Sequence, residues 1–289
     1  MRPRALPIAL AALLVAGDAA AGPVEGRVFV DANGDGTLSR GEETLSGVQV
    51  AWETEVFATS GDDGLYELET PNEDGIVWAR VPDGYRPGPV WGKVGAAGGT
   101  VDLPLVEIEA SAPAHFVVAS DLHIGKEKLN DPGESLDDDD LERSLRQAAA
   151  LVDAPRFFAL TGDLVQSNQP QHYAILRDVA AGLGVPVVPV PGNHDWFDGG
   201  ASYRETMGPP MYSFDSAGAH YIVLNDNASV SEWSSFLQQD TGDLDEAVPL
   251  VGFIHRPPEP AELAALESSG IDYLFTGHWH SNMTHQFGD

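Results

Sequence analysis

Short runs of alternating hydrophobic and polar residues dominate the first part of the chain. They are separated by turn sequences such as DDG, NEDG and PDG, in which Gly and Asp favour chain reversal. Alternation with a period of two is typical of strands that bury one face. The pattern therefore predicts a small all-β sandwich over residues 22–109, followed by an Ala- and Pro-containing linker at 110–114. The predicted strands are GRVFV, VQVAW, GLYEL, IVWARV and TVDLPLVEI.

From His115 onward, apolar strand-like runs alternate with helical or polar stretches. This alternation is the signature of an α/β layered domain, which we predict over residues 115–289. The acidic run 137–140 precedes apolar residues at helical spacing, so we interpret it as the first turn of a helix rather than as a calcium site. The predicted strands are HFVVAS, RFFALT, VPVVPV, HYIVLN, PLVGFIH and DYLFT.

The N-terminus has the features of a secretory signal peptide. Arg2 and Arg4 precede the apolar run ALPIALAALLVA, which is too short to span a bilayer, and AAAG offers a cleavage site after Ala21. Residues 1–21 are therefore expected to be a signal peptide that directs the protein to the periplasm or outside the cell. We expect no membrane span. The chain contains no cysteine, which excludes disulfides, thiolate metal ligands and a lipid-modified cysteine.

The net charge of the chain is strongly negative, at −30. This charge argues against nucleic-acid duplexes and anionic lipids as partners, because no basic patch is present to neutralise phosphates. A phosphate group bound here would need metal cations to offset the negative field.

Five of the predicted α/β strands end in Asp, Asn or His residues. Alternation along an extended strand end puts Asp121 and His123 on one side of the chain, and likewise His278 and His280. Such residues taken singly are often helix caps or surface groups, but strand ends on one side of an open sheet converge on one crevice. Carboxylate, amide and imidazole ligands suit Mn, Fe or Zn, so the series predicts a metal site. The motifs are DLH (121–123), GDLVQ (162–166), GNHD (192–195), His255 and GHWH (277–280).

This ordered series resembles the signature blocks of the calcineurin-like metallophosphoesterase superfamily, over the chain from about His115 to its end. The resemblance implies a four-layer α/β/β/α sandwich and two divalent transition metals (Mn, Fe or Zn). It also implies that His194 is the proton donor and phosphate contact and that Asp195 orients its ring. The implied ligands are Asp121, His123 and His280 for one metal, Asn193, His255 and His278 for the other, and Asp163 as the bridge.

The implied activity is hydrolysis of phosphate mono- or diesters. A hydroxide that bridges the two metals would attack the phosphorus, and His194 would act as general acid toward the leaving group. Gln166 ends the second motif, and no Arg follows it as in the protein serine/threonine phosphatases of this superfamily, so a phosphoprotein substrate is disfavoured. The sequence does not identify the substrate or the oligomeric state.

Two features of this region leave alternatives open. Members of the superfamily usually continue past GHxH with further strands, whereas SNMTHQFGD is all that follows here, which fits either a minimal or a C-terminally truncated member. The residues beside the motifs either contact the substrate or have a structural role, in packing or in a surface ion pair. These residues are Trp196, Phe197, Trp279 and Arg256.

A second candidate metal site lies in DANGDGTLSRGE (31–42). A β-run rather than a helix precedes it, so it is not an EF-hand. The segment resembles the calcium-binding β-sandwich modules of bacterial surface proteins, and an Asp/Gly turn that binds nothing is the alternative. The spacing matches a calcium loop with oxygens from Asp31, Asn33, Asp35, the Thr37 carbonyl, Ser39 through water, and Glu42, and with Gly36 at the sharp turn.

The sequence thus favours a secreted two-metal phosphoesterase with an N-terminal calcium-stabilised β-sandwich. The alternative is a calcium-dependent surface binding module that carries an inactive metallophosphoesterase-like domain. The complete series of motifs favours the enzyme.

Overall fold

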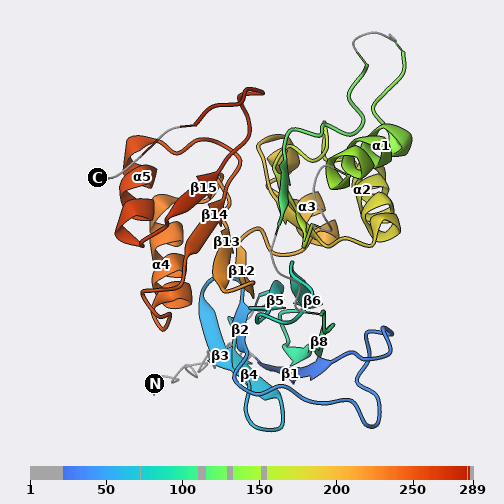
Figure 1. Cartoon of the computed structure of the whole chain (residues 1–289). Coiled ribbons are helices and arrows are strands. Elements are labelled where there is room, and N and C mark those ends of the chain that lie inside the picture. The colour runs from blue at the N-terminus through green and yellow to red at the C-terminus, as the bar shows by residue number, and fades with distance from the viewer. Residues whose placement is uncertain are drawn as a thin grey trace, which may run out of the picture.

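The computed structural model describes residues 22–71, 73–109, 115–128, 133–150, 155–284 and 286. The predicted signal peptide and linker lie outside the described residues. In Figure 1 the N-terminal strands lie beneath two α/β halves, which stand side by side.

The N-terminal strands form two sheets. In the first, β1 (Pro23–Val30) lies between β4 (Leu65–Glu69) and β7 (Gly99–Thr100), and β8 (Leu103–Leu105) pairs with the second half of β1. The second sheet is antiparallel, in the order β3 (Val56–Thr59), β2 (Gln49–Trp52), β5 (Gly75–Ala79), β6 (Val90–Val94). The burial of β4 alternates, with Tyr66 and Leu68 inside, as its sequence pattern predicts.

These N-terminal strands do not pack separately from the rest of the chain. Trp78 of β5 contacts Phe236 edge to face, with ring centroids 6.1 Å apart, and Glu53 accepts a hydrogen bond of 2.9 Å from Arg204. One cluster of buried residues contains members from Val24 in β1 to Ile271 in the second α/β half. Because the core is continuous, packing does not delimit a separate all-β domain, and the division into 22–109 and 115–289 stays a prediction.

The first α/β sheet is parallel, in the order β11 (Val187–Val190), β10 (Phe158–Thr161), β9 (Val117–Ala119). Phe158 and Leu160 belong to a core with α1 (Asp138–Ala149) and α2 (Pro170–Leu183), whereas Phe157 and Ala159 belong to the large continuous core. Asp137 caps α1 by accepting a hydrogen bond from the Asp140 amide at 3.3 Å, which confirms the helical interpretation of the acidic run.

The second α/β sheet has the order β12 (Tyr212–Ser216), β13 (Ala219–Val223), β14 (Leu250–Phe253), β15 (Tyr273–Phe275). β12 runs antiparallel to β13, and β13, β14 and β15 are parallel. Its helices are α4 (Val230–Thr241) and α5 (Pro260–Ser268), and the short α3 (Ala201–Thr206) belongs to the first half.

Aromatic rings fill the space between the two α/β sheets. Phe116 stacks on Phe157 with centroids 5.0 Å apart and contacts Phe275 edge to face at 5.5 Å, while Phe157 meets Tyr221 at 5.1 Å. With α4 and α5 on one outer side and α1 and α2 on the other (Figure 1), this packing is consistent with the expected α/β/β/α order. In the described residues, no helix has both the length and the apolar character needed to cross a bilayer.

Candidate metal centre

The predicted metal ligands follow the carboxyl ends of strands from both α/β sheets. Asp121 and His123 follow β9, Asp163 follows β10, and Asn193 follows β11. From the second sheet, His255 follows β14, and His278 and His280 follow β15. Both sheets therefore deliver side chains to one shared edge, as parallel strand ends do in layered α/β proteins.

Three overlapping groups of side chains bring potential ligand atoms together in the described part of the chain. Within each group these atoms lie within 4.8 Å of one another. His123 belongs to the first and second groups and Asp163 to the second and third, so the groups form one continuous array. The groups are Asp121, His123 and His280; His123, Asp163 and His194; and Asp163, His255 and His278.

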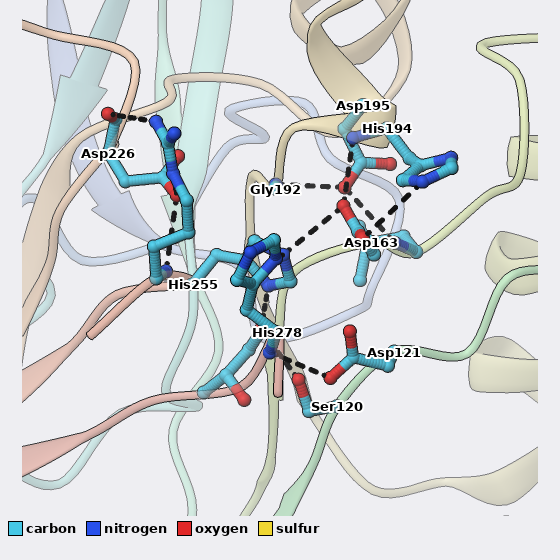
Figure 2. A network of polar contacts seen from close by, with 12 residues as sticks. Ser120, Asp121, Asp163, Gly192, His194, Asp195, Asp226, His255 and His278 are labelled. Carbon is cyan, nitrogen blue, oxygen red and sulfur yellow. Dashed lines mark hydrogen bonds and ion pairs between the residues drawn. The ribbon is translucent and has the colours of Figure 1, made fainter. Parts of the chain in front are cut away.

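The Asp163 carboxylate lies at the centre of this array (Figure 2). Its Oδ1 is 3.3 Å from His255 Nε2 and accepts a 2.8 Å hydrogen bond from the His194 amide, while its Oδ2 is 3.7 Å from His123 Nε2. Asp163 is 2% exposed, so these contacts form in a site with little water. A carboxylate between two groups of imidazoles has the geometry required of a bridging ligand.

Main-chain groups orient two of the candidate ligands. The Nδ1 atom of His255 lies 2.9 Å from the Thr161 carbonyl oxygen, which can only accept, so Nδ1 carries a proton. The other ring nitrogen, Nε2, faces Asp163 Oδ1 and His278 Nδ1, each 3.3 Å away. The amide of His278 donates to Asp121 Oδ2 at 2.9 Å, which leaves Asp121 Oδ1 directed at His280 Nε2, 3.2 Å away. Each of the two ligands thus keeps one potential metal-binding atom directed into the array.

The donor set fits divalent transition metals. Asp121 Oδ1 and Asn193 Oδ1 are buried and have no hydrogen-bond partner among the described residues. Buried polar oxygens are rarely left unpaired, so such atoms mark positions at which a cation would bind. Carboxylate, amide and imidazole donors in the absence of cysteine match Mn, Fe or Zn.

Backbone strain is concentrated at the same residues. Of the eight described non-glycine residues with positive φ, five are predicted ligands. A left-handed backbone costs free energy in residues with a Cβ and persists where the surrounding structure enforces it, often at functional sites. The five are Asp121 (56°), His123 (46°), Asp163 (49°), His278 (70°) and His280 (47°).

Two glycines allow the strand ends to approach one another. A Cβ on Gly162 would lie 2.4 Å from the His255 ring, and a Cβ on Gly192 would lie 2.3 Å from the Asp163 amide nitrogen. Both distances are too short for real atoms, so only glycine fits at these positions.

For Asp163 and His123, the electrostatics favour the protonation states that metal ligands need. Burial by itself raises the pKa of Asp163, but the neighbouring His255 imidazole and the hydrogen bond from the His194 amide outweigh it and hold this pKa below the ordinary carboxyl value. Burial lowers the pKa of His123 more than the neighbouring Asp163 raises it. The carboxylate is thereby kept ionised and the imidazole neutral.

Asp195 does not orient the ring of His194, contrary to the expectation from the sequence. The His194 Nδ1 atom instead lies 2.8 Å from the Gln166 carbonyl oxygen. The Asp195 carboxylate is fully buried and accepts hydrogen bonds from the amides of Leu164 and Gly192, at 3.0 and 2.9 Å. The carboxylate is thus bound by main-chain donors, and none of its hydrogen bonds among the described residues comes from the imidazole. Burial raises the pKa of Asp195 to about 6, although these hydrogen bonds lower it in part.

The residues beside the motifs have different surroundings. Arg256 donates from Nε to Asp226 Oδ2 at 2.7 Å and from a terminal nitrogen to the Asp226 carbonyl at 2.8 Å, which is an ion pair rather than a free phosphate contact. Phe197 is 64% exposed, and its ring centroid lies 5.0 Å from that of His194. Trp279 is 56% exposed between two predicted ligands. The two aromatic residues are therefore accessible to a bound substrate.

The predicted calcium loop is a closed turn whose side chains bind its own amides. Asp31 accepts from Gly34 and Gly36 at 2.8 and 2.9 Å, and Glu42 accepts from Ser39 at 2.7 Å. Asn33 Oδ1 accepts from the Asp35 amide at 2.9 Å, and Asp35 Oδ1 from the Thr37 amide at 2.8 Å. The loop is not one of the three groups found above, so calcium binding stays a prediction.

Sequence reasoning missed the groups that orient the ligands. The Thr161 and Gln166 carbonyls hold two histidine rings, and Tyr173 donates a hydrogen bond of 3.0 Å to Asp195. No sequence signal identifies an orienting carbonyl, because every residue has one.

Similarity to known proteins covers the part of the chain that carries the ligand array. The sequence model described as calcineurin-like phosphoesterase matches residues 114–282. A probable cyclic nucleotide phosphodiesterase of Fibrobacter succinogenes is 30% identical over 156 residues, which are 45% of this chain and 59% of that protein. The glycerophosphodiester phosphodiesterase GpdQ of Enterobacter lignolyticus is 26% identical over 144 residues, 42% of this chain and 49% of the relative.

A probable cyclic nucleotide phosphodiesterase of a Synechococcus strain is 27% identical over 131 residues, 41% of this chain and 49% of the relative. The chain therefore spans about half the length of the curated relatives it matches.

Proposed function

Since the chain belongs to the calcineurin-like phosphoesterase family, we propose that it is a metal-dependent phosphoric ester hydrolase with a dinuclear centre at Asp163. The observation that carries the proposal is the continuous array of ligand atoms. Asp163 and His123 each belong to two of its three groups, so the groups are joined. One metal would be held by Asp121, His123 and His280 and the other by Asn193, His255 and His278, with Asp163 shared.

His194 and the Gln166 carbonyl each have a specific part in the proposed reaction. Two divalent metals, when bound, acidify a water molecule and neutralise the phosphoryl oxygens. The Gln166 carbonyl fixes the proton of His194 on Nδ1, so Nε2 is the atom that would carry a proton to the leaving alkoxide. His194 is 24% exposed in its side chain, which lets it reach both the centre and a substrate.

Phosphodiesters are the substrate class we propose first. The names of all three relatives above refer to phosphodiesterases. The exposed ring of Phe197 beside His194 offers an apolar surface next to the proposed leaving-group position. Phosphate monoesters are the second class.

Two further parts of the proposal rest on the sequence. Calcium would bind the loop with Asp31, Asn33, Asp35, Thr37 and Glu42, and would stabilise the N-terminal strands. Residues 1–21 would direct the protein to the periplasm or outside the cell, which cell fractionation would test.

A direct assay tests the proposed function. The protein, purified with Mn or Zn, is offered p-nitrophenyl phosphate, a p-nitrophenyl phenylphosphonate diester and a nucleotide, with Asp163→Ala as control. Hydrolysis by the wild type and not by Asp163→Ala is expected. A metal-loaded wild type that is inert on all three substrates would contradict the enzyme and favour the binding module.

A further inference from the structure

The buried carboxylate of Asp195 joins the two loops that carry Asp163 and His194. Its Oδ2 accepts from the amides of Leu164 and Gly192, and its Oδ1 accepts from Val165 at 3.3 Å. Leu164 and Val165 directly follow Asp163, while Gly192 lies two residues before His194. One side chain therefore fixes the loop after β10 against the loop after β11 (Figure 2).

Tyr173 of α2 supplies the one side-chain donor to this carboxylate among the hydrogen bonds of the described residues. Its hydroxyl donates to Asp195 Oδ1 at 3.0 Å, and the residue is fully buried. The other bond at the same oxygen is the longer one from Val165, at 3.3 Å. Loss of the hydroxyl would leave Asp195 Oδ1 with the weaker donor alone, at a fully buried carboxylate.

We propose that Tyr173, acting through Asp195, is a positioning residue for the Asp163–His194 pair. The inference rests on the proposed function, since it assigns Tyr173 to the same centre. When Asp195 shifts, Leu164 and Gly192 shift with it, and Asp163 and His194 move relative to one another. A displacement of this kind affects metal affinity and turnover together, because Asp163 is the shared ligand and His194 the proton donor.

Tyr203 is a matched control for Tyr173. Both tyrosines are fully buried, and their rings meet edge to face with centroids 6.4 Å apart. The Tyr203 hydroxyl donates to the Pro189 carbonyl at 3.0 Å, an oxygen that also accepts from Tyr212 at 3.1 Å. Tyr203→Phe therefore removes an equivalent buried hydroxyl from the same core and leaves the hydrogen bonds of Asp195 intact.

The experiment compares Tyr173→Phe and Tyr203→Phe with the wild type in the full chain. It measures Mn(II) affinity by titration followed with electron paramagnetic resonance, kcat and KM on bis(p-nitrophenyl) phosphate, and the melting temperature. Tyr173→Phe is expected to lower both Mn(II) affinity and kcat by about tenfold or more, with KM unchanged, as loss of a group that orients metal ligands does. Tyr203→Phe is expected to retain the wild-type Mn(II) affinity, kcat and KM.

The outcomes separate this inference from the proposed function. Equal Mn(II) affinity and kcat in the two variants would overturn the role of Tyr173, whatever their melting temperatures. A wild type that binds Mn(II) but hydrolyses no ester would overturn the proposed function, and Mn(II) affinity alone would then decide the positioning role. A wild type that binds no Mn(II) would overturn both.

Discussion

The Nδ1 atom of His194 lies 2.8 Å from the carbonyl oxygen of Gln166, while Nε2 of the same ring lies 3.9 Å from Asp163 Oδ2. Because a carbonyl only accepts, the first contact determines which ring nitrogen is protonated, and the second directs the other nitrogen at the centre of the ligand array. The candidate proton donor is thus oriented by a main-chain atom.

His194→Ala is expected to retain the metals and lose turnover. Loss of a positioned general acid costs about 10²-fold to 10⁴-fold in kcat, and the loss should be largest for alkyl esters, whose leaving alkoxide needs a proton most. Metal content and kcat on an alkyl and a p-nitrophenyl diester measure it. His115→Ala, which changes a histidine outside the motifs, is the control. Full activity of His194→Ala on the alkyl ester would exclude the role.

Removal of the shared ligand Asp163 should affect both metal positions. Removal of His280, at the edge of the array, should affect only one. Asp163→Ala takes away the carboxylate common to two groups, so metal content is expected to fall at both positions. His280 is 53% exposed at the edge of the array, so His280→Ala should release one metal and retain the other. Metal analysis after dialysis distinguishes the variants. Identical metal content in both would contradict a bridging role for Asp163.

Calcium is expected to raise the melting temperature of the wild type. Ions that bind the native state alone stabilise it by mass action. Asp31 is 6% exposed and accepts hydrogen bonds from several loop amides, so Asp31→Asn should abolish the calcium-dependent shift. Thermal unfolding with calcium, and with calcium plus chelator, measures the effect. An unchanged melting temperature up to millimolar calcium would contradict calcium binding at this loop.

A buried charged network outside the metal centre connects the N-terminal strands to the second α/β sheet. His220 is fully buried, with Nδ1 2.7 Å from Asp215 Oδ1 and Nε2 2.9 Å from Asp240 Oδ2. Arg80, which follows β5, contacts Asp215 Oδ2 through Nε at 3.2 Å. Both ring nitrogens face carboxylates, so the imidazole is held in its protonated form.

The network is expected to give a bounded pH range of stability. Burial lowers the pKa of His220, but hydrogen bonds to Asp215 and Asp240 raise it above the ordinary value. Its stabilisation is complete below the ordinary histidine pKa and is lost as pH rises through the raised folded-state pKa. For Asp215, burial raises the pKa, but the bond from His220 and the charge of Arg80 bring it below the ordinary carboxyl value. Its stabilisation is complete above that value and is lost as pH falls through the lowered folded-state pKa.

His220→Gln tests this pH dependence. The variant removes the cation beside Asp240, which is fully buried, and beside Asp215, which is partly buried and keeps its contact with Arg80. Leaving a buried carboxylate without its partner costs roughly 3 to 5 kcal/mol of unfolding free energy. Urea unfolding of metal-free protein at several pH values should show that the difference between wild type and variant shrinks as pH rises above the histidine range. A difference that stays constant across this range would contradict the protonated state of His220.

The limits of sequence reasoning are clear in particular elements. Strongly apolar runs gave β10, β11 and β14, because a buried strand needs continuous hydrophobic residues. The strands β3, β6 and β12 escaped notice, because their short runs include glycine or polar residues and depend on pairing with neighbours. The prediction that Asp195 orients the His194 ring was wrong, because adjacency in GNHD does not determine which donors surround the Asp195 carboxylate.

By itself, the sequence determined which residues end the α/β strands and that these are oxygen and nitrogen ligands, because strand patterns and ligand chemistry are local properties. Only the tertiary structure decided that Asp163 is shared between two groups, that carbonyls orient His194 and His255, and that Tyr173 contacts Asp195. These relationships join segments far apart in the chain. They are made by loop backbones held by packing and hydrogen bonds, which no local pattern encodes.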